Sequence, residues 1–342
     1  MTTQVAFLFP GQGSQAVGMG ADIFEASPAA RRVFESVDEA LGIGLSNLCF
    51  QGPEDVLRET VNAQPAIVTV SLASLAALQE AFSEHTSSWS SPLVPSYTAG
   101  HSVGEYAALV ASDAFHLQDA VRLVRERGRL MHHEGTVCPG GMAAIIGMDA
   151  ETLQEICREA TAQSTANLAR DAHPGAGQVI IANFNAPGQI VISGEQGALN
   201  LAMELAKARG AKRVIPLAVS GAFHSPVMQP AAAGLALAIE STDVHEAAIP
   251  VIGNIDAKPL TDVQAIREEL AQQIATAVQW IRTIEYLVNA GVTTFVEIGP
   301  GQALTGMVKR IAKGVTTMNV SSAADIEKAV VIIREMGLVV GV

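Results

Sequence analysis

The sequence predicts an α/β protein built on one mostly parallel sheet, with a small βαββαβ unit inserted in the middle of the chain. Near both ends of the chain, short apolar runs alternate with amphipathic helical stretches, a pattern typical of parallel sheets covered by helices. Between residues 138 and 217 the pattern changes to closely spaced strands. The 342 residues are 49% hydrophobic, which is enough for two domains, and we place them at 1–137 with 218–342, and at 138–217.

Composition and charge exclude several classes of protein. The formal net charge of -13 provides no general attraction for nucleic acid or for an anionic membrane. Cys49, Cys138 and Cys157 are far apart and show no metal-ligand spacing, so we expect a reducing cytoplasm and no metal site. The N-terminus lacks the basic segment of a signal peptide, and no run approaches 18 uninterrupted apolar residues. We therefore expect a cytoplasmic protein.

The two flanking parts alternate between strands and helices. Before the insertion we expect strands at 5–9 and 93–98, helices at 21–41, 64–82, 105–111 and 117–131, and a polar link at 84–92. After it we expect helices at 225–239, 262–276, 280–289 and 303–312, with strands at 250–254 and 293–298. Both flanks would contribute to one sheet.

The inserted part has its own order of elements. We expect strands at 142–147, 179–183, 189–193 and 213–219, with helices at 150–162 and 195–209. This βαββαβ order is the ferredoxin-like arrangement. The stretch 164–177, which contains proline and glycine, is predicted to be a surface loop.

A G-x-S-x-G motif at Gly100–Gly104 is the first candidate for chemistry. A serine on a tight turn between strand and helix is exposed, and the flanking glycines remove side chains that would clash. The motif alone is common in a chain with 30 glycines. Here an apolar strand precedes it and a helix follows it, which favours Ser102 as a nucleophile.

A nucleophilic serine needs a base, and the chain has eight histidines. His224 lies in a loop between a strand and a helix, where its side chain would face a cleft or merely belong to a helix-capping loop. Arg127 follows the serine motif on an amphipathic helix. Its planar guanidinium group would bind a carboxylate, or it would be solvated like the other arginines of that helix.

The glycine-rich loop after the first strand allows two interpretations. Gly11, Gly13 and Ala16 match the fingerprint of a dinucleotide-binding oxidoreductase. The acidic residue that this fingerprint requires at the end of a second strand is missing, since Glu35 and Asp38 lie in a helical pattern. The alternative is that a backbone N–H of this loop stabilises an oxyanion.

Several separated motifs, in the same order, resemble the acyltransferase family of fatty acid and polyketide synthesis, which includes malonyl-CoA:acyl-carrier-protein transacylases. They are FPGQGSQ at 9–15, GHSVGEYAAL at 100–109, LVRERG at 123–128, NFNAPGQ at 183–189, AFHSPVM at 222–228 and VEIGPG at 296–301. The resemblance covers nearly the whole chain. It implies an α/β-hydrolase-like large domain with the ferredoxin-like small domain inserted.

The resemblance also implies a ping-pong acyl transfer. Ser102 would attack the thioester of malonyl-CoA with His224 as general base, and the malonyl-serine ester would then pass its acyl group to the phosphopantetheine thiol of acyl carrier protein. The backbone N–H groups of Gln12 and Val103 would hold the oxyanion. The backbone carbonyl of Gln273 would orient the His224 ring.

Four further residues would bind the substrate by the same resemblance. Arg127 would pair with the free malonyl carboxylate, and Phe223 before the histidine is the residue typical of members that use malonyl rather than methylmalonyl groups. His101 and Asn183 match positions that line the pocket. No cofactor is implied.

Acyl carrier protein and malonyl-CoA are therefore the expected partners of a monomer that binds neither nucleic acid nor membrane. Because the carrier is acidic, basic residues should surround the cleft mouth, and the candidates are Lys207, Arg209, Lys212, Arg213, Lys309, Arg310 and Lys313. An acyl-thioester hydrolase with the same serine and histidine is the nearest alternative. A non-catalytic carrier-docking protein would not need Ser102, His224 and Arg127 together.

Overall fold

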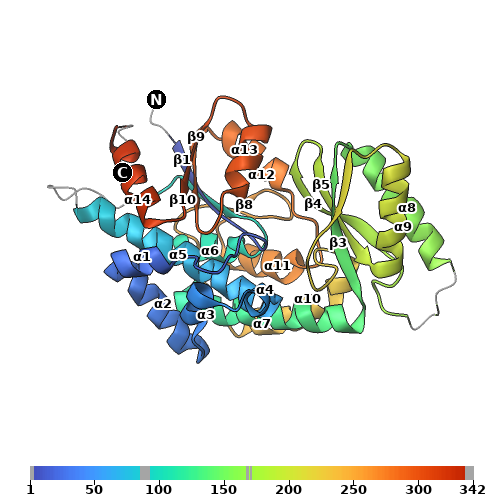
Figure 1. The fold of residues 1–342 in the computed structure, drawn as a ribbon, viewed down its shortest axis with the longest axis horizontal. Coiled ribbons are helices and arrows are strands. Elements are labelled where there is room, and N and C mark those ends of the chain that lie inside the picture. Colours follow the sequence, from blue (N-terminus) through green and yellow to red (C-terminus); the bar gives the residue numbers. More distant parts are fainter. Residues whose placement is uncertain (1–3, 85–92, 167–168, 170–171, 336–342) are drawn as a thin grey trace.

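The computed structural model describes residues 4–84, 93–166, 169 and 172–335, and it contains two sheets. Figure 1 shows a larger part with the termini at one end of the molecule and a smaller part, with α8 and α9, at the other. Most of the polar link expected at 84–92, and part of the loop expected at 164–177, lie outside the described residues.

The larger sheet has six strands in the order β10-β9-β1-β2-β7-β8. Its strands are β1 (Gln4–Phe9), β2 (Tyr97–Gly100), β7 (Val251–Ile252), β8 (Pro259–Leu260), β9 (Val292–Ile298) and β10 (Thr316–Val320). All pairs are parallel except β7 with β8, so the prediction of a mostly parallel sheet shared by both flanks is confirmed. Phe9 is in register with Gly100, which brings the ends of β1 and β2 together.

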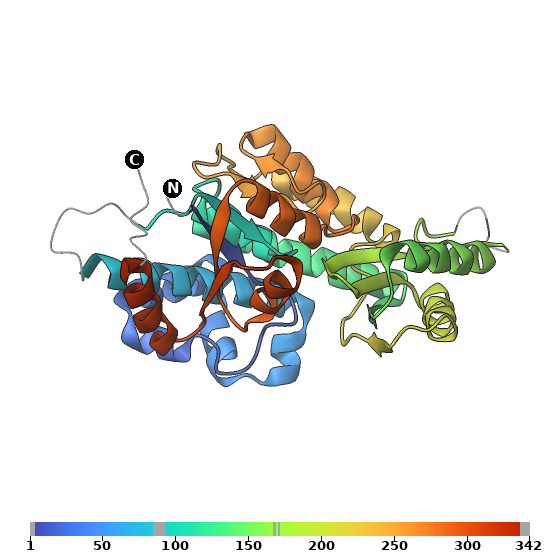
Figure 2. The same ribbon diagram turned by 90° about the horizontal axis from the view of Figure 1, so that it is seen from above.

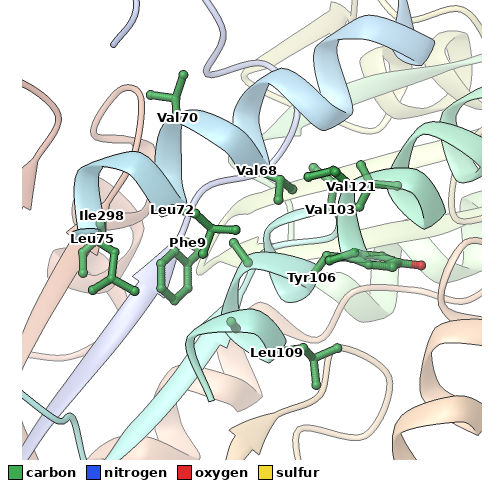
Figure 3. Close-up of a cluster of buried hydrophobic side chains, with 14 of the residues drawn as sticks. Phe9, Val68, Val70, Leu72, Leu75, Val103, Tyr106, Leu109, Val121 and Ile298 are labelled. Carbon is green, nitrogen blue, oxygen red and sulfur yellow. The ribbon is translucent and has the colours of Figure 1, made fainter. Parts of the chain in front are cut away.

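Helices cover both faces of this sheet, as seen from above in Figure 2. Alternate residues of β1 point to opposite faces: Phe7 and Phe9 belong to one hydrophobic cluster, and Ala6 and Leu8 to another. The first cluster includes residues of α5, and Figure 3 shows Phe9 beside Leu72 of that helix. Burial on both faces explains why β1 is a continuous apolar run rather than an alternating one.

Two helices of the first flank, at 45–51 and 54–58, were not predicted, and the others differ from the prediction in their boundaries. The helices of this flank are α1 (Ala21–Ala26), α2 (Pro28–Leu41), α3 (Leu45–Gln51), α4 (Glu54–Arg58), α5 (Thr60–Glu84), α6 (Gly104–Ala111) and α7 (Leu117–Val137). The single helix expected at 21–41 is two helices, because Ser27 caps a new helix by accepting a hydrogen bond from Ala30 N and Pro28 starts its first turn.

Among the described residues, one helical stretch, 60–83, is long and apolar enough to cross a membrane, but 83% of its most apolar window is buried inside the molecule. Its small and apolar residues pack against the sheet and against α7 and α2. The stretch is therefore a core helix of this fold.

The smaller sheet is antiparallel, with four strands in the order β4-β5-β3-β6. Its elements are β3 (Gly140–Ile146), α8 (Ala150–Thr165), β4 (Val179–Ala186), β5 (Gln189–Glu195), α9 (Gln196–Ala208) and β6 (Arg213–Pro216). The βαββαβ order is the one predicted, and the two helices and the sheet enclose a hydrophobic cluster of their own. The strand expected to run to residue 219 ends at Pro216, and the following residues return the chain to the larger part.

The second flank returns to the larger sheet. Its helices are a 3₁₀ turn η1 (Pro226–Met228), α10 (Gln229–Glu240), α11 (Val263–Gln273), α12 (Trp280–Asn289), α13 (Ala303–Ile311) and α14 (Ala323–Glu335). The strand β10 and the helix α14 were not predicted. β10 extends the sheet beyond β9, α14 packs beside β10, and both lie away from the smaller part (Figure 1).

Candidate active site

Ser102 lies on the tight turn between β2 and α6 and has a φ of 52°, a backbone conformation that is strained for a serine. The glycines on either side make this turn possible. A Cβ on Gly100 would come within 2.0 Å of the Gly104 backbone, and a Cβ on Gly104 would come within 2.2 Å of the Phe9 carbonyl oxygen. The turn therefore presents the serine side chain at the end of the sheet, as the motif predicted.

Asn254 stabilises this turn through two hydrogen bonds. Its Oδ1 accepts a hydrogen bond from Ser102 N at 2.7 Å, and its Nδ2 donates to Gly100 O at 2.7 Å. The fully buried Glu105 in turn accepts a hydrogen bond from Asn254 N at 2.8 Å. Burial, reinforced by the nearby Glu269, raises the pKa of the Glu105 carboxyl well above its usual value.

Sequence reasoning missed both supporting residues. Glu105 carried a usable signal, because it is the one acidic residue in the apolar helix α6, and a buried carboxyl needs partners. Asn254 follows the short strand β7 and gave no comparable signal.

Ser102 and His224 form a hydrogen-bonded pair, with 2.7 Å between Oγ and Nε2. The other ring nitrogen, Nδ1, lies 2.9 Å from the carbonyl oxygen of Gln273 and 3.1 Å from that of Thr276. A carbonyl oxygen only accepts, so Nδ1 carries the proton and Nε2 is left to accept the serine hydroxyl. The second carbonyl, that of Thr276, was not foreseen.

The environment of His224 keeps its ring neutral. The side chain is buried, and burial together with the positive charge of Arg127 lowers its pKa to about 3. At neutral pH the imidazole is therefore unprotonated at Nε2, which is the state that a general base requires.

Arg127 is buried beside this pair, with only 1% of its surface exposed. Its guanidinium donates hydrogen bonds to Gln64 Oε1 at 2.6 Å, to Gln273 Oε1 at 2.9 Å and to Ser102 Oγ at 3.0 Å, and it lies over the Tyr106 ring. None of these partners carries a negative charge. Burial lowers the pKa of the guanidinium, although the nearby Tyr106 and Glu105 oppose this shift. The site is therefore electrostatically suited to an anion.

The other three arginines of α7 have different surroundings, which the sequence pattern could not distinguish. Arg122 and Arg129 are exposed and form ion pairs with Asp119 and Glu126, respectively. Arg125 is half-buried. Among the four arginines of α7, only Arg127 therefore has its guanidinium beside Ser102, where it could bind a carboxylate. Its hydrogen-bond partner Gln64 on α5 was not identified from the sequence.

Two backbone N–H groups lie next to the serine without an acceptor. The register of β1 with β2, and the hydrogen bond from His101 N to Phe9 O at 3.0 Å, bring the Gln12 loop beside the serine turn. Within residues 4–84, 93–166, 169 and 172–335, the N–H groups of Gln12 and Val103 have no hydrogen-bond partner. Val103 also stands at the N-terminus of α6, where the helix dipole favours negative charge.

The dinucleotide interpretation of this loop finds no support. The second glycine of the fingerprint, Gly13, donates its N–H to Gln15 Oε1 at 2.7 Å instead of leaving it free for a phosphate. Glu35 and Asp38 both lie in the helix α2, and Asp38 caps the next helix by accepting a hydrogen bond from Ser46 N. The acidic residue at a strand end is absent from this unit of the described chain.

A cavity of about 230 Å³ opens over Ser102. Its walls come from the loop after β1, from α7 and α13 of the larger part, and from β3, β4, β5 and the returning link of the smaller part. Gln12, His101, Arg127, Asn183, Phe223 and His224 all line it, so the structure brings these predicted residues together. Gln273 contributes through its hydrogen bonds to His224 and Arg127.

His101 and Asn183, which both line the cavity, differ in their surroundings. His101 Nε2 lies 2.8 Å from Asn185 Oδ1, its ring contacts Trp280 edge-on, and burial lowers its pKa. Asn183 lines the cavity, and its backbone bridges to Val278. The neighbouring Asn185 was not predicted, although it lies in the same sequence motif.

The basic residues expected around the cleft are only partly free. Arg310 on α13 donates hydrogen bonds to Gln189 Oε1 and to Pro187 O, and so connects the larger part to the turn between β4 and β5. Arg209 forms an ion pair with Glu159. The side chains of the remaining candidates are exposed: Lys207, Lys212, Arg213, Lys309 and Lys313.

Comparison with known proteins agrees with this geometry. The family described as acyl transferase domain matches residues 6–334. A malonyl CoA-acyl carrier protein transacylase of Bacillus subtilis is 45% identical over 97% of this chain and 98% of its own length. The corresponding transacylase of Escherichia coli O157:H7 is 40% identical over 92% and 94%.

Solved structures show the same fold. An acyl-carrier-protein-S-malonyltransferase from Bartonella henselae superposes with a TM-score of 0.87 at 41% identity, over 98% of this chain and all of the other. A malonyl-transacylase solved in complex with a type II PKS acyl-carrier protein has a TM-score of 0.85 at 38% identity, over 96% of this chain and all of the other. By sequence and by structure, the chain belongs to the acyl transferase domain family and is an acyltransferase.

Proposed function

We propose that this protein transfers a malonyl group from malonyl-CoA to the phosphopantetheine thiol of acyl carrier protein in fatty acid biosynthesis. The observation that carries the proposal is the buried Arg127, which lies 3.0 Å from Ser102 Oγ and has only uncharged partners. A cation in this position matches an acyl group that ends in a free carboxylate. The names of the two relatives from Bacillus subtilis and Escherichia coli, both malonyl CoA-acyl carrier protein transacylases, support the same substrate.

The first half-reaction loads the enzyme. As Ser102 Oγ attacks the thioester carbon, its proton moves to His224 Nε2, 2.7 Å away. The N–H groups of Gln12 and Val103 stabilise the negative oxygen of the tetrahedral intermediate. When the carbon–sulfur bond breaks, His224 returns the proton to the CoA sulfur, and malonyl-serine remains.

The second half-reaction reverses the roles. The carrier thiol gives its proton to His224, and its sulfur attacks the ester carbon of malonyl-serine. The carbon–oxygen bond then breaks and Ser102 Oγ recovers the proton. The carbonyl groups of Gln273 and Thr276 keep the Nδ1–H fixed throughout, so that Nε2 always faces the reaction.

The remaining predicted residues shape the acyl pocket. Arg127 binds the malonyl carboxylate, and the nearly buried Phe223 fills the space that an α-methyl group would need. His101 and Asn183 line the same cavity. All steps use the side chains and backbone of this chain, so the proposal requires no cofactor.

The proposal includes the finer description of the fold. Residues 1–137 with 218–342 form an α/β-hydrolase-like catalytic domain, and residues 138–217 form a ferredoxin-like one. The strand order β4-β5-β3-β6 supports the second assignment. Substrate binds between the two, which matches the walls of the cavity. We propose a cytoplasmic monomer whose partner is acyl carrier protein, as in the solved relative with its carrier.

The mass of the intact protein after brief exposure to malonyl-CoA tests the proposed function. The wild-type chain should gain one malonyl group, Ser102→Ala should gain none, and added phosphopantetheinylated carrier should remove the group within one turnover. An adduct on Ser102→Ala would place the nucleophile elsewhere. An adduct that water removes as fast as the carrier does would make the protein a thioester hydrolase instead.

A further inference from the structure

Two histidines and an aspartate form a cluster that takes no part in the proposed reaction. His116 precedes α7, and Asp243 and His245 lie in the segment after α10. Arg127 follows His116 by eleven positions on the same helix, which corresponds to about 16 Å along its axis. None of the three lines the cavity over Ser102.

The three side chains point their ligand atoms at one another. One atom from each residue lies within 4.8 Å of the other two. His245 Nε2 is 3.5 Å from Asp243 Oδ2, and the two imidazole rings are 5.2 Å apart with an angle of 67° between their planes. In the described part of the chain His245 Nε2 is inaccessible to solvent and has no hydrogen-bond partner, although the side chain as a whole is 44% exposed. The Asp243 oxygen at 3.5 Å lies beyond the usual hydrogen-bond distance, so this nitrogen is free to take another partner.

Backbone hydrogen bonds hold the two contributing segments together. His245 N donates to Ala114 O at 2.9 Å, and Ala248 N donates to Ser112 O at 2.8 Å. The carbonyl of His116 accepts a hydrogen bond from Ala120 N at 3.0 Å, so His116 is fixed to the first turn of α7. These backbone hydrogen bonds therefore fix the positions of the segments that carry the three side chains.

We propose that His116, Asp243 and His245 bind a divalent transition-metal ion of the zinc type. Two imidazoles and one carboxylate are a ligand set that Zn²⁺ accepts, with water completing a tetrahedron. Metal–ligand bonds of about 2.0–2.1 Å imply ligand atoms about 3.4 Å apart, a separation that Asp243 and His245 already have at 3.5 Å. Small side-chain rotations bring His116 into the same sphere.

Asp243 supplies the negative charge of the proposed ligand set. Asp243 also borders a cavity of about 400 Å³ with Asp119, Glu126 and Arg122. Arg122 is paired with Asp119 at 3.4 Å and Arg129 with Glu126 at 2.6 Å. Among the described residues, Asp243 is thus the one of these three carboxylates that forms no ion pair with an arginine. Bound metal would cross-link the segment after α10 to the start of α7, the helix that carries Arg127, and would stabilise the folded state.

Zinc titration of the metal-free full-length chain against a chromophoric chelator tests this site. We expect one tight equivalent in the wild type, and at least about tenfold weaker binding in His116→Ala and in His245→Ala. His132→Ala, an exposed histidine on the same helix, is the matched control and should bind as the wild type does. Cobalt should give the visible absorption of a tetrahedral site in the wild type and in His132→Ala, and lose it in His245→Ala.

Two further readouts separate the site from the active centre and from a folding defect. Zinc should raise the melting temperature of the wild type but not that of His245→Ala, and the metal-free melting temperatures of the two should be similar. Malonyl loading by metal-free His245→Ala should equal that of the wild type. If the protein loads a different acyl group, loading of that group should likewise be equal in the two proteins. Zinc binding that is equally tight in all variants, or no binding to the wild type, would overturn the proposal.

Discussion

Ser102 and His224 share an uncommon feature: both have positive φ angles, 52° and 58°. Each such conformation costs about 1–3 kcal/mol and persists only where the surroundings hold it. For Ser102 the surroundings are two glycines and Asn254, and for His224 they are the Ile274 and Gln273 carbonyls that accept its N–H groups. These two backbone conformations place Ser102 Oγ and His224 Nε2 2.7 Å apart.

The low pKa of His224 predicts the pH dependence of enzyme loading. The base is active when neutral, hence above its pKa, and burial with Arg127 lowers that pKa to about 3. The rate of malonyl-serine formation should therefore remain flat from pH 8 down to about pH 5, rather than halving near the ordinary histidine value of about 6.5. Rapid quenching at each pH measures this rate. An apparent pKa close to 6.5 would contradict the structural explanation.

At the scale of elements, the turn between β2 and α6 depends on a residue from the end of β7. Removing the side chain in Asn254→Ala deletes the acceptor of Ser102 N and the donor to Gly100 O, and it leaves Glu105 Oε2 with the Asn254 backbone N–H but without the side-chain amide. A displaced nucleophile can cost about 100-fold in rate. We expect kcat for transfer to fall by about 10- to 100-fold while KM for malonyl-CoA changes little.

Asn254→Asp separates positioning from a general loss of structure. Its carboxylate still accepts from Ser102 N but can no longer donate to Gly100 O or to Glu105 Oε2. The aspartate variant should recover part of the rate that the alanine variant loses. The melting temperatures of both variants are measured in parallel. A loss of rate that follows only the melting temperature would show that Asn254 stabilises the fold and does not position Ser102.

How far the sequence predicts these elements depends on their patterns. The βαββαβ order and the helix Trp280–Asn289 were correct, because their apolar spacing is regular. The paired strand at 316–320 was missed, since Thr316, Thr317 and Asn319 interrupt its apolar residues. Gln64 and Asn254 were missed for a different reason: each supports the site through a contact distant in sequence, which no local pattern encodes.

At the scale of the whole molecule, the cavity lies between the two parts, and Arg310 connects them across it. Lys309 and Arg310 on α13 are both exposed, but the Arg310 guanidinium is hydrogen-bonded to Gln189 and Pro187, so Lys309 is better placed to meet an acidic carrier. Lys309→Glu should raise the KM for carrier protein by up to about tenfold and leave loading from malonyl-CoA unchanged.

Lys328→Glu provides the control for that charge change. Lys328 is exposed on α14, at the opposite end of the molecule from the smaller part (Figure 1). It changes the net charge by the same amount and should leave the carrier KM as it is. Equal effects of the two variants would indicate a response to total charge rather than a docking surface.

The central claim is that a buried cation beside the Ser102–His224 pair selects an acyl group with a free carboxylate. The most direct test compares the kcat/KM of loading from malonyl-CoA and from acetyl-CoA in the wild type, in Arg127→Ala and in the exposed control Arg129→Ala. Truncating one partner of a buried, hydrogen-bonded charge pair typically costs about 2–5 kcal/mol of binding, so Arg127→Ala should lower the malonyl value by at least about 30-fold and shift the preference toward acetyl-CoA. Arg129→Ala should retain the wild-type preference. An unchanged ratio of the two substrates in Arg127→Ala would contradict the claim.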